Sequence, residues 1–172
     1  MVDRERQLRE KLAGEPDDAE AVRELASLVA QARGRKQEAA ELWARYAVLS
    51  DNEGTPEPLL QLARALIEAR REEEAVETLV RCSALHPDEA AVFDMLGEVL
   101  RYSGRVEEAA EALERACRLD PESLRPRLAL ASCMDALGRP EEAQRILEKV
   151  RADASADPAV AALVRELIHR RG

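Results

Sequence analysis

The side chains best suited to catalysis are few in this sequence and widely spaced. The two histidines, His86 and His169, stand far apart, and neither belongs to an HExxH pair or follows a glycine-rich phosphate loop. Paired carboxylates such as Glu107–Glu108 precede apolar periodic stretches, where acidic groups offset the positive end of a helix dipole. We therefore expect a chain that is not an enzyme and that uses neither a cofactor nor a metal ion.

The three cysteines, Cys82, Cys117 and Cys133, show no pattern of redox or metal chemistry. Their number is odd, and no pair has CxxC or metal-ligand spacing. A free cysteine behaves as a small apolar residue when it is buried. We predict reduced, partly buried thiols, with Cys82 in a core position.

Charge and composition exclude several classes of partner. The chain of 172 residues has a net charge of −9 and few aromatic residues, so it lacks the basic field that nucleic acids and anionic membranes attract. Its first residues, MVDRERQLREKL, contain no apolar signal-peptide core, and no apolar stretch is long enough to span a membrane. We expect a cytoplasmic protein that binds no nucleic acid and does not insert into a membrane.

The elements that would position any functional side chain are clearest between residues 90 and 123. Phe93, Leu96, Gly97 and Leu100 recur at helical spacing, Gly104 breaks the pattern, and a second helical pattern ends before a proline. This is a helix, a short turn, a second helix and a stop within 34 residues. The residues expected to be buried in this hairpin are Leu96, Gly97, Ala109, Leu113 and Ala116.

The same layout recurs on both sides at a period of 34 residues. The core slots of the preceding copy hold Leu59, Leu62, Ala63, Leu66, Ala75, Leu79, Cys82 and Pro87. Those of the following copy hold Leu130, Ala131, Met134, Gly138, Ala143, Leu147 and Val150. A fixed period of this length with paired helices is typical of a solenoid. The pattern resembles the tetratricopeptide repeat family, whose signature slots are matched in order by Phe93, Leu96, Gly97, Leu100, Ala109, Leu113, Ala116 and Pro121.

The resemblance implies an all-α, right-handed superhelical α-solenoid of helix hairpins with an extra helix at each end. It divides a single domain, residues 1–172, into successive parts. These are an N-terminal helix in 1–16, repeats in 17–53, 56–89, 90–123 and 124–157, and a C-terminal capping helix in 158–172. We expect ten helices and no strands, with the last helix over 157–170.

Repeat 1 and repeat 2 depart locally from the family pattern. Asp17 is predicted to cap the first helix of repeat 1, and Trp43 is predicted to lie in the core because it falls on the apolar stripe. The inter-helix turn of repeat 1 is one residue longer than in the other repeats, and Tyr46 fills a slot that usually holds Ala. Arg70 stands where glycine is expected, which predicts strain or a different turn shape.

Because the sequence shows no catalytic motif, we expect the protein to act through a binding surface. In the family, the first helix of each hairpin lines the concave side, and the groove-facing slots lie between the core slots. The resemblance assigns to a partner-binding groove Arg23, Leu60, Arg64, Ile67, Asp94, Glu98, Arg101, Tyr102, Leu128 and Asp135. The neighbouring slots hold Glu20, Ser27, Glu68, Arg125 and Ser132. Some relatives clamp a C-terminal carboxylate with Lys, Arg and Asn, and because these slots contain neither Lys nor Asn we do not expect a clamp of that type.

These slots leave three functional hypotheses. The first is a non-catalytic adaptor or scaffold that holds a peptide or helix of a partner protein, with apolar anchors and charges of both signs. The second is a chaperone for a secreted or assembly subunit, similar to those of type III secretion. The third is an assembly module that forms homo-oligomers through an end helix.

Overall fold

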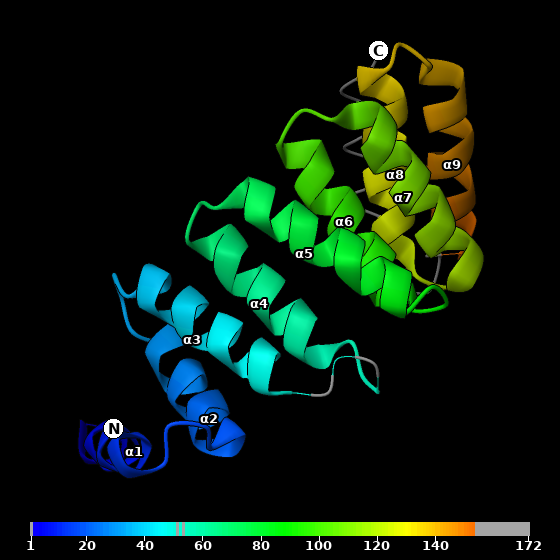
Figure 1. Cartoon of the computed structure of the whole chain (residues 1–172). Coiled ribbons are helices and arrows are strands. Elements are labelled where there is room, and N and C mark those ends of the chain that lie inside the picture. Colours follow the sequence, from blue (N-terminus) through cyan, green and yellow to red (C-terminus); the bar gives the residue numbers. More distant parts are fainter. Residues whose placement is uncertain (1, 51, 53, 154–172) are drawn as a thin grey trace. The chain divides into compact units, whose positions relative to one another are not determined.

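The structure is a computed structural model that describes residues 2–50, 52 and 54–153. These residues form nine helices and no strand (Figure 1). The helices are α1 (Val2–Gly14), α2 (Ala19–Ala30), α3 (Lys36–Leu49), α4 (Glu57–Glu68), α5 (Glu72–Leu85), α6 (Ala90–Tyr102), α7 (Val106–Leu119), α8 (Leu124–Ala136) and α9 (Pro140–Asp153). The all-α prediction is confirmed over this part of the chain. The expected tenth helix, over 157–170, lies outside the described residues.

The helices belong to two compact units. The first, Met1–Pro87, contains α1 and the hairpins α2–α3 and α4–α5, and the second, Asp88–Gly172, contains the hairpins α6–α7 and α8–α9. Within each unit, helices that follow one another along the chain pack side by side. Each unit therefore holds two of the four predicted repeats.

Three of the hairpins share one turn geometry. Their connections have three residues, and the middle one, Arg70, Gly104 or Gly138, has a positive φ of 60°, 78° or 71°. The next residue donates its backbone N–H to a carbonyl of the preceding helix, as Arg105 does to Leu100 at 2.9 Å. This is the Schellman closure of a helix end. Arg70 thus keeps the shape of the turn and bears the strain of a left-handed conformation.

The first hairpin closes differently. Five residues, 31–35, separate α2 from α3, so the turn of repeat 1 is longer than the other three by two residues, where the sequence predicts one. The left-handed position is Gly34, with φ 79°. The predicted cap at Asp17 is wrong by one residue. Asp18 caps α2, because its Oδ1 accepts the backbone N–H of Ala21 at 2.8 Å.

The core of the second unit is built around a close helix approach. The residues predicted to be buried, Leu96, Gly97, Ala109, Leu113 and Ala116, are all buried. A Cβ atom at Gly97 would lie 2.5 Å from Leu113 Cγ and 3.2 Å from the carbonyl oxygen of Ala109. Glycine is therefore required for α6 and α7 to pack at this separation.

The core of the first unit joins α1 to the α2–α3 hairpin. Leu8 and Leu12 of α1 are buried in one cluster with Val22, Leu25 and Val29 of α2. The prediction that Trp43 belongs to the core is confirmed, since it is 6% exposed. Its indole packs edge-on against Tyr46, which is partly buried beside the same cluster.

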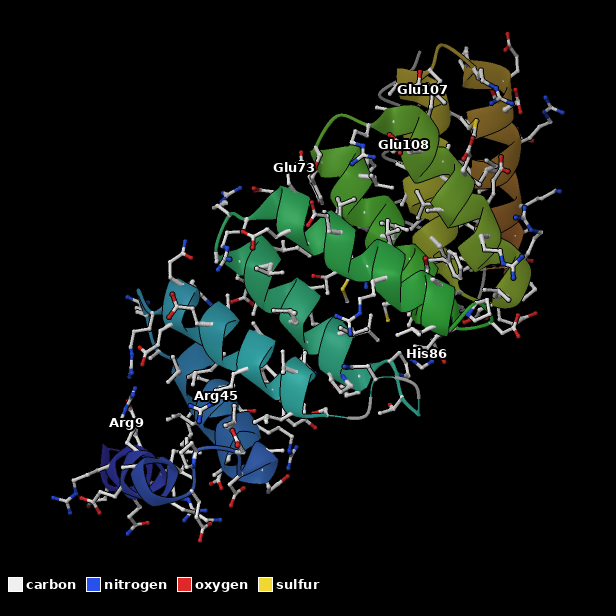
Figure 2. All side chains as sticks on the ribbon, in the orientation of Figure 1. Arg9, Arg45, Glu73, His86, Glu107 and Glu108 are labelled. Carbon is white, nitrogen blue, oxygen red and sulfur yellow. The ribbon has the colours of Figure 1, made fainter. Side chains whose placement is uncertain are left out.

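An arginine stands immediately before the second helix of every hairpin. Each of the four donates to a glutamate three residues later, and the pairs are Arg35–Glu38, Arg71–Glu74, Arg105–Glu108 and Arg139–Glu142. Hydrogen bonds from these arginines lower the pKa of all four glutamates below the ordinary value. The carboxylates also lie in the first turn of their helices, where negative charge is favoured. Glu107 and Glu108 can be seen at the start of α7 (Figure 2).

Candidate protein-binding surface

The groove residues predicted in the first unit differ in accessibility. Arg23 and Arg64 are exposed on α2 and α4, and Ile67 is half-buried. Leu60 is only 5% exposed, so it offers little surface to a partner. Arg23 pairs with Glu20 one turn earlier on the same helix, which leaves its guanidinium partly engaged.

The second unit gathers more of the predicted residues. Its two first helices, α6 and α8, are in contact with each other. Helical spacing places Asp94, Glu98 and Arg101 on one stripe of α6, and a similar stripe of α8 carries Leu128 and Asp135. We name the surface formed by these stripes, together with Tyr102 and Arg125, the α6–α8 face.

One ion pair crosses the α6–α8 face. Arg125 of α8 lies 3.5 Å from the Oδ2 atom of Asp94, and the Arg125 side chain is 67% exposed. The Oδ1 atom of Asp94 is buried and has no hydrogen-bond partner among the described residues. Burial raises the pKa of Asp94, and the opposing attraction of Arg125 only partly offsets this effect. Asp94 is thus a half-buried, incompletely stabilised carboxylate.

A second charged group lies two turns further along α6. Arg101 donates to Glu98 at 2.8 Å, and both side chains are largely buried. The Arg101 guanidinium lies 4.3 Å from the centroid of the Tyr102 ring, within the range of a cation–π interaction. Tyr102 itself is 75% exposed. The end of α6 therefore exposes the Tyr102 ring to solvent, and the Arg101 guanidinium packs against this ring.

The three cysteines behave as core residues of their own units. Cys82 and Cys133 are buried and Cys117 is half-buried, and all three are free thiols, as the sequence predicts. Burial raises the pKa of the Cys117 and Cys133 thiols. A raised thiol pKa disfavours the reactive thiolate at neutral pH.

The described residues contain no cluster of three or more His, Cys, Asp or Glu side chains that could hold a metal ion. None of the helices described here is both long and apolar enough to cross a membrane. The α6–α8 face instead offers an exposed ring, charges of both signs and a half-buried Leu128. These groups suit recognition of another protein by apolar contact and hydrogen bonding.

Sequence reasoning found the stripes of this face but missed how their charges pair. The four pairs of Arg and Glu before the second helices were also missed, although the arginines at 71, 105 and 139 recur at the repeat period. That periodicity is the signal that could have identified them. The pair between Asp94 and Arg125 joins different repeats, and its partners are chosen by packing of α6 against α8.

Comparisons with known proteins agree on the fold. Residues 60–123 and 100–167 each match a family model described as tetratricopeptide repeat. A crystal structure of MamA superposes with a TM-score of 0.78 at 22% identity, covering 88% of this chain and 87% of that chain. MamA from Desulfovibrio magneticus RS-1 gives a TM-score of 0.78 at 20% identity, over 90% of this chain and 85% of that chain.

A third similar structure is YrrB, described as a TPR protein with an unusual peptide-binding site. It has a TM-score of 0.78 at 16% identity and covers 96% of this chain and 84% of that chain. None of the curated proteins matches the chain. At these levels of identity, the structural likeness defines the fold and not the ligand.

Proposed function

Because the chain belongs to the tetratricopeptide repeat family, we propose that it is a non-catalytic adaptor that binds a peptide or helix of a partner protein. In the second unit, the proposed contact surface is the α6–α8 face. In the first unit, taken by itself, Arg23, Arg64 and Ile67 on the first helices α2 and α4 are the proposed contact residues.

The incomplete stabilisation of Asp94 is the observation that carries this proposal. A half-buried carboxylate with an unpaired oxygen lowers the stability of the fold, and groups with perturbed pKa values gather at functional sites. Arg125, which forms an ion pair with Asp94, is mostly exposed and 3.5 Å away, so a bound protein can compete for this arginine. Tyr102 supplies exposed aromatic area at the end of the same stripe.

Three further considerations support a protein as the ligand. Tyr and Arg are enriched among the residues that dominate binding energies at protein interfaces. By its description, the similar protein YrrB has a peptide-binding site. The net charge of −9 disfavours nucleic acid. We place the adaptor in the cytoplasm, where free thiols such as those of its three cysteines stay reduced.

Affinity capture followed by mass spectrometry tests the proposal. The immobilised chain is compared with the variant Arg125→Glu/Tyr102→Ala and with Arg118→Glu. Arg118 is a matched control because it is 63% exposed on a second helix, α7, where its weak ion pair with Glu114 measures 3.9 Å. We expect a protein captured by the wild type and by the control but lost from the double variant.

Two other results would replace the adaptor hypothesis. A partner that stays soluble only when it is co-expressed with this chain would indicate a subunit chaperone. A mass well above one chain in light scattering, with no heterologous protein captured, would indicate an assembly module. Capture that is equal for all three proteins would place the binding surface away from the α6–α8 face.

A further inference from the structure

The N-terminal helix α1 is attached to the rest of the first unit largely by charged side chains. Arg4 donates two hydrogen bonds to Glu24 of α2, at 2.6 and 2.7 Å. Arg35, which precedes α3, donates to both carboxylate oxygens of Glu5, at 2.7 and 2.9 Å. Two more pairs at the same junction are Arg9–Glu38 and Lys11–Asp18. Figure 2 shows Arg9 on α1.

The apolar part of this attachment is small. Leu8 and Leu12 are the buried leucines of α1, and they cover Val22, Leu25 and Val29 of α2. With α1 in place, those three residues are at most 2% exposed. Without it, three large aliphatic side chains on one helix stripe would meet water, which is unfavourable in a soluble protein.

This combination makes α1 the part of the unit that opens most easily. Partly exposed ion pairs contribute little individually and are screened by salt. A separate helix of 13 residues is only marginally stable in water. Elements with few buried apolar contacts open at low free energy, while the packed hairpins stay closed.

The link between α1 and α2 permits such opening. Glu15, Pro16 and Asp17 are all exposed, so this segment buries no apolar anchor. A hydrogen bond from the Arg45 guanidinium to the carbonyl oxygen of Pro16 holds it to α3. This bond is a single surface contact, and moving the link disturbs no core residue.

We propose that α1 is an exchangeable helix, which a second copy of this chain can supply in place of the chain's own. We choose a second copy as the occupant because its α1 has the same two leucines, four residues apart. Its charged residues also stand in the order that pairs with the charged residues of the α2–α3 hairpin. Exchange in both directions gives a two-fold symmetric dimer that recreates the same contacts in each half. This inference concerns the first unit and does not depend on the α6–α8 face.

Two charge-reversed chains test the exchange. The first carries Arg4→Glu and Glu5→Arg, so its α1 is repelled by its own Glu24 and Arg35. The second carries Glu24→Arg and Arg35→Glu, so its unchanged α1 meets the wrong charges. When the two are mixed, each α1 matches the α2–α3 hairpin of the other chain. A chain with all four substitutions is the control, because its own α1 fits again.

The readout is light scattering after size-exclusion chromatography, with circular dichroism to confirm folding. We expect each double variant alone and the fourfold control to run as monomers, and the equimolar mixture to reach twice the 19.1 kDa of one chain. A mixture that stays monomeric, while both chains are folded, would overturn the proposal.

A second measurement tests the exchange if the chain with Glu24→Arg and Arg35→Glu does not fold. The chain with Arg4→Glu and Glu5→Arg keeps the native α2–α3 hairpin. A fluorescent peptide of residues 1–14 should therefore bind to this chain at least tenfold more tightly than to the wild type. The same peptide with Leu8→Asp should not bind. Equal binding of the native peptide to both chains, or no binding, would contradict the exchange.

Discussion

Gly97 sets the separation between α6 and α7. The β-carbon of an alanine there would lie 2.5 Å from Leu113 Cγ, and Leu113 is fully buried and has little room to move. We expect Gly97→Ala to destabilise the protein by about 1–3 kcal/mol through overpacking. Gly14→Ala is the control, because a β-carbon at Gly14 has no neighbouring atom within 4 Å. Chemical denaturation measures both, and equal stabilities would refute the close approach.

Arg70 destabilises the turn in which it lies, because it adopts a left-handed backbone conformation. Its φ of 60° lies in the left-handed region, where Gly104 and Gly138 serve the equivalent turns. A left-handed conformation costs a non-glycine residue about 1–2 kcal/mol, and glycine loses part of this advantage through the entropy of the unfolded chain. We expect Arg70→Gly to raise the free energy of unfolding by up to about 1 kcal/mol. Gly104→Ala should lower it, and a destabilised Arg70→Gly variant would show that the arginine side chain stabilises the turn.

Asp94 should leave a signature in the pH dependence of stability. Its pKa is raised by burial above the ordinary value of 3.8, so the folded chain binds this proton more tightly than the unfolded chain does. The penalty for ionising Asp94 therefore appears as pH rises above 3.8 and grows as pH rises through the raised pKa. We expect Asp94→Asn to be more stable than the wild type at pH 7, with the difference shrinking toward pH 3. Parallel stability curves for the two proteins would contradict this.

The burial of side chains could be predicted from the sequence better than the pairing of charged side chains. The positions of Trp43, Cys82 and Gly97 follow from the apolar period, which the sequence displays directly. For Leu60 the slot alone leaves open whether the side chain faces the groove or packs against a neighbouring helix, because the family slots do not say how wide the buried stripe is, and Leu60 is buried. The pair between Asp94 and Arg125 depends on packing between helices, which spacing along one helix does not encode.

At the scale of elements, α1 depends on ionised Glu5. Hydrogen bonds from Arg35 and then Arg9 lower the pKa of Glu5 from 4.5 to about 2. A lowered pKa means that this contribution to stability is present above pH 4.5 and is lost as pH falls toward 2. We expect a carboxylate NMR titration of Glu5 with a midpoint near 2 in the wild type and closer to 4.5 in Arg35→Ala. A midpoint that Arg35→Ala leaves unchanged would exclude this contact as the cause.

Helix positions follow from the repeat period, and the exact ends do not. The turns at Gly104 and Gly138 are marked by glycine, whereas the turn at Arg70 has the same shape without that signal. Asp17 and Asp18 are adjacent and chemically identical, so composition does not choose between them as the cap of α2. Asp18 is the cap in the folded chain because its side chain accepts the Ala21 N–H and also pairs with Lys11.

At the scale of the molecule, each unit combines packed hairpins with one feature for which we propose a role in binding. In the first unit this feature is α1, held by charge pairs and two leucines. In the second it is the α6–α8 face, where exposed side chains surround the imperfectly stabilised Asp94. A repeat fold suits this division because its stability comes from local contacts between neighbouring helices. The surface can then carry recognition without supporting the core.

The most direct test of the adaptor function is the affinity of the captured partner, measured by titration calorimetry against three purified proteins. We predict that Arg125→Glu/Tyr102→Ala binds at least tenfold more weakly than the wild type, a loss of about 1.4 kcal/mol or more. Arg118→Glu should bind as the wild type does, and circular dichroism should show the same helicity for all three proteins. A double variant that remains folded and binds with wild-type affinity would contradict the assignment of the α6–α8 face as the partner-binding surface.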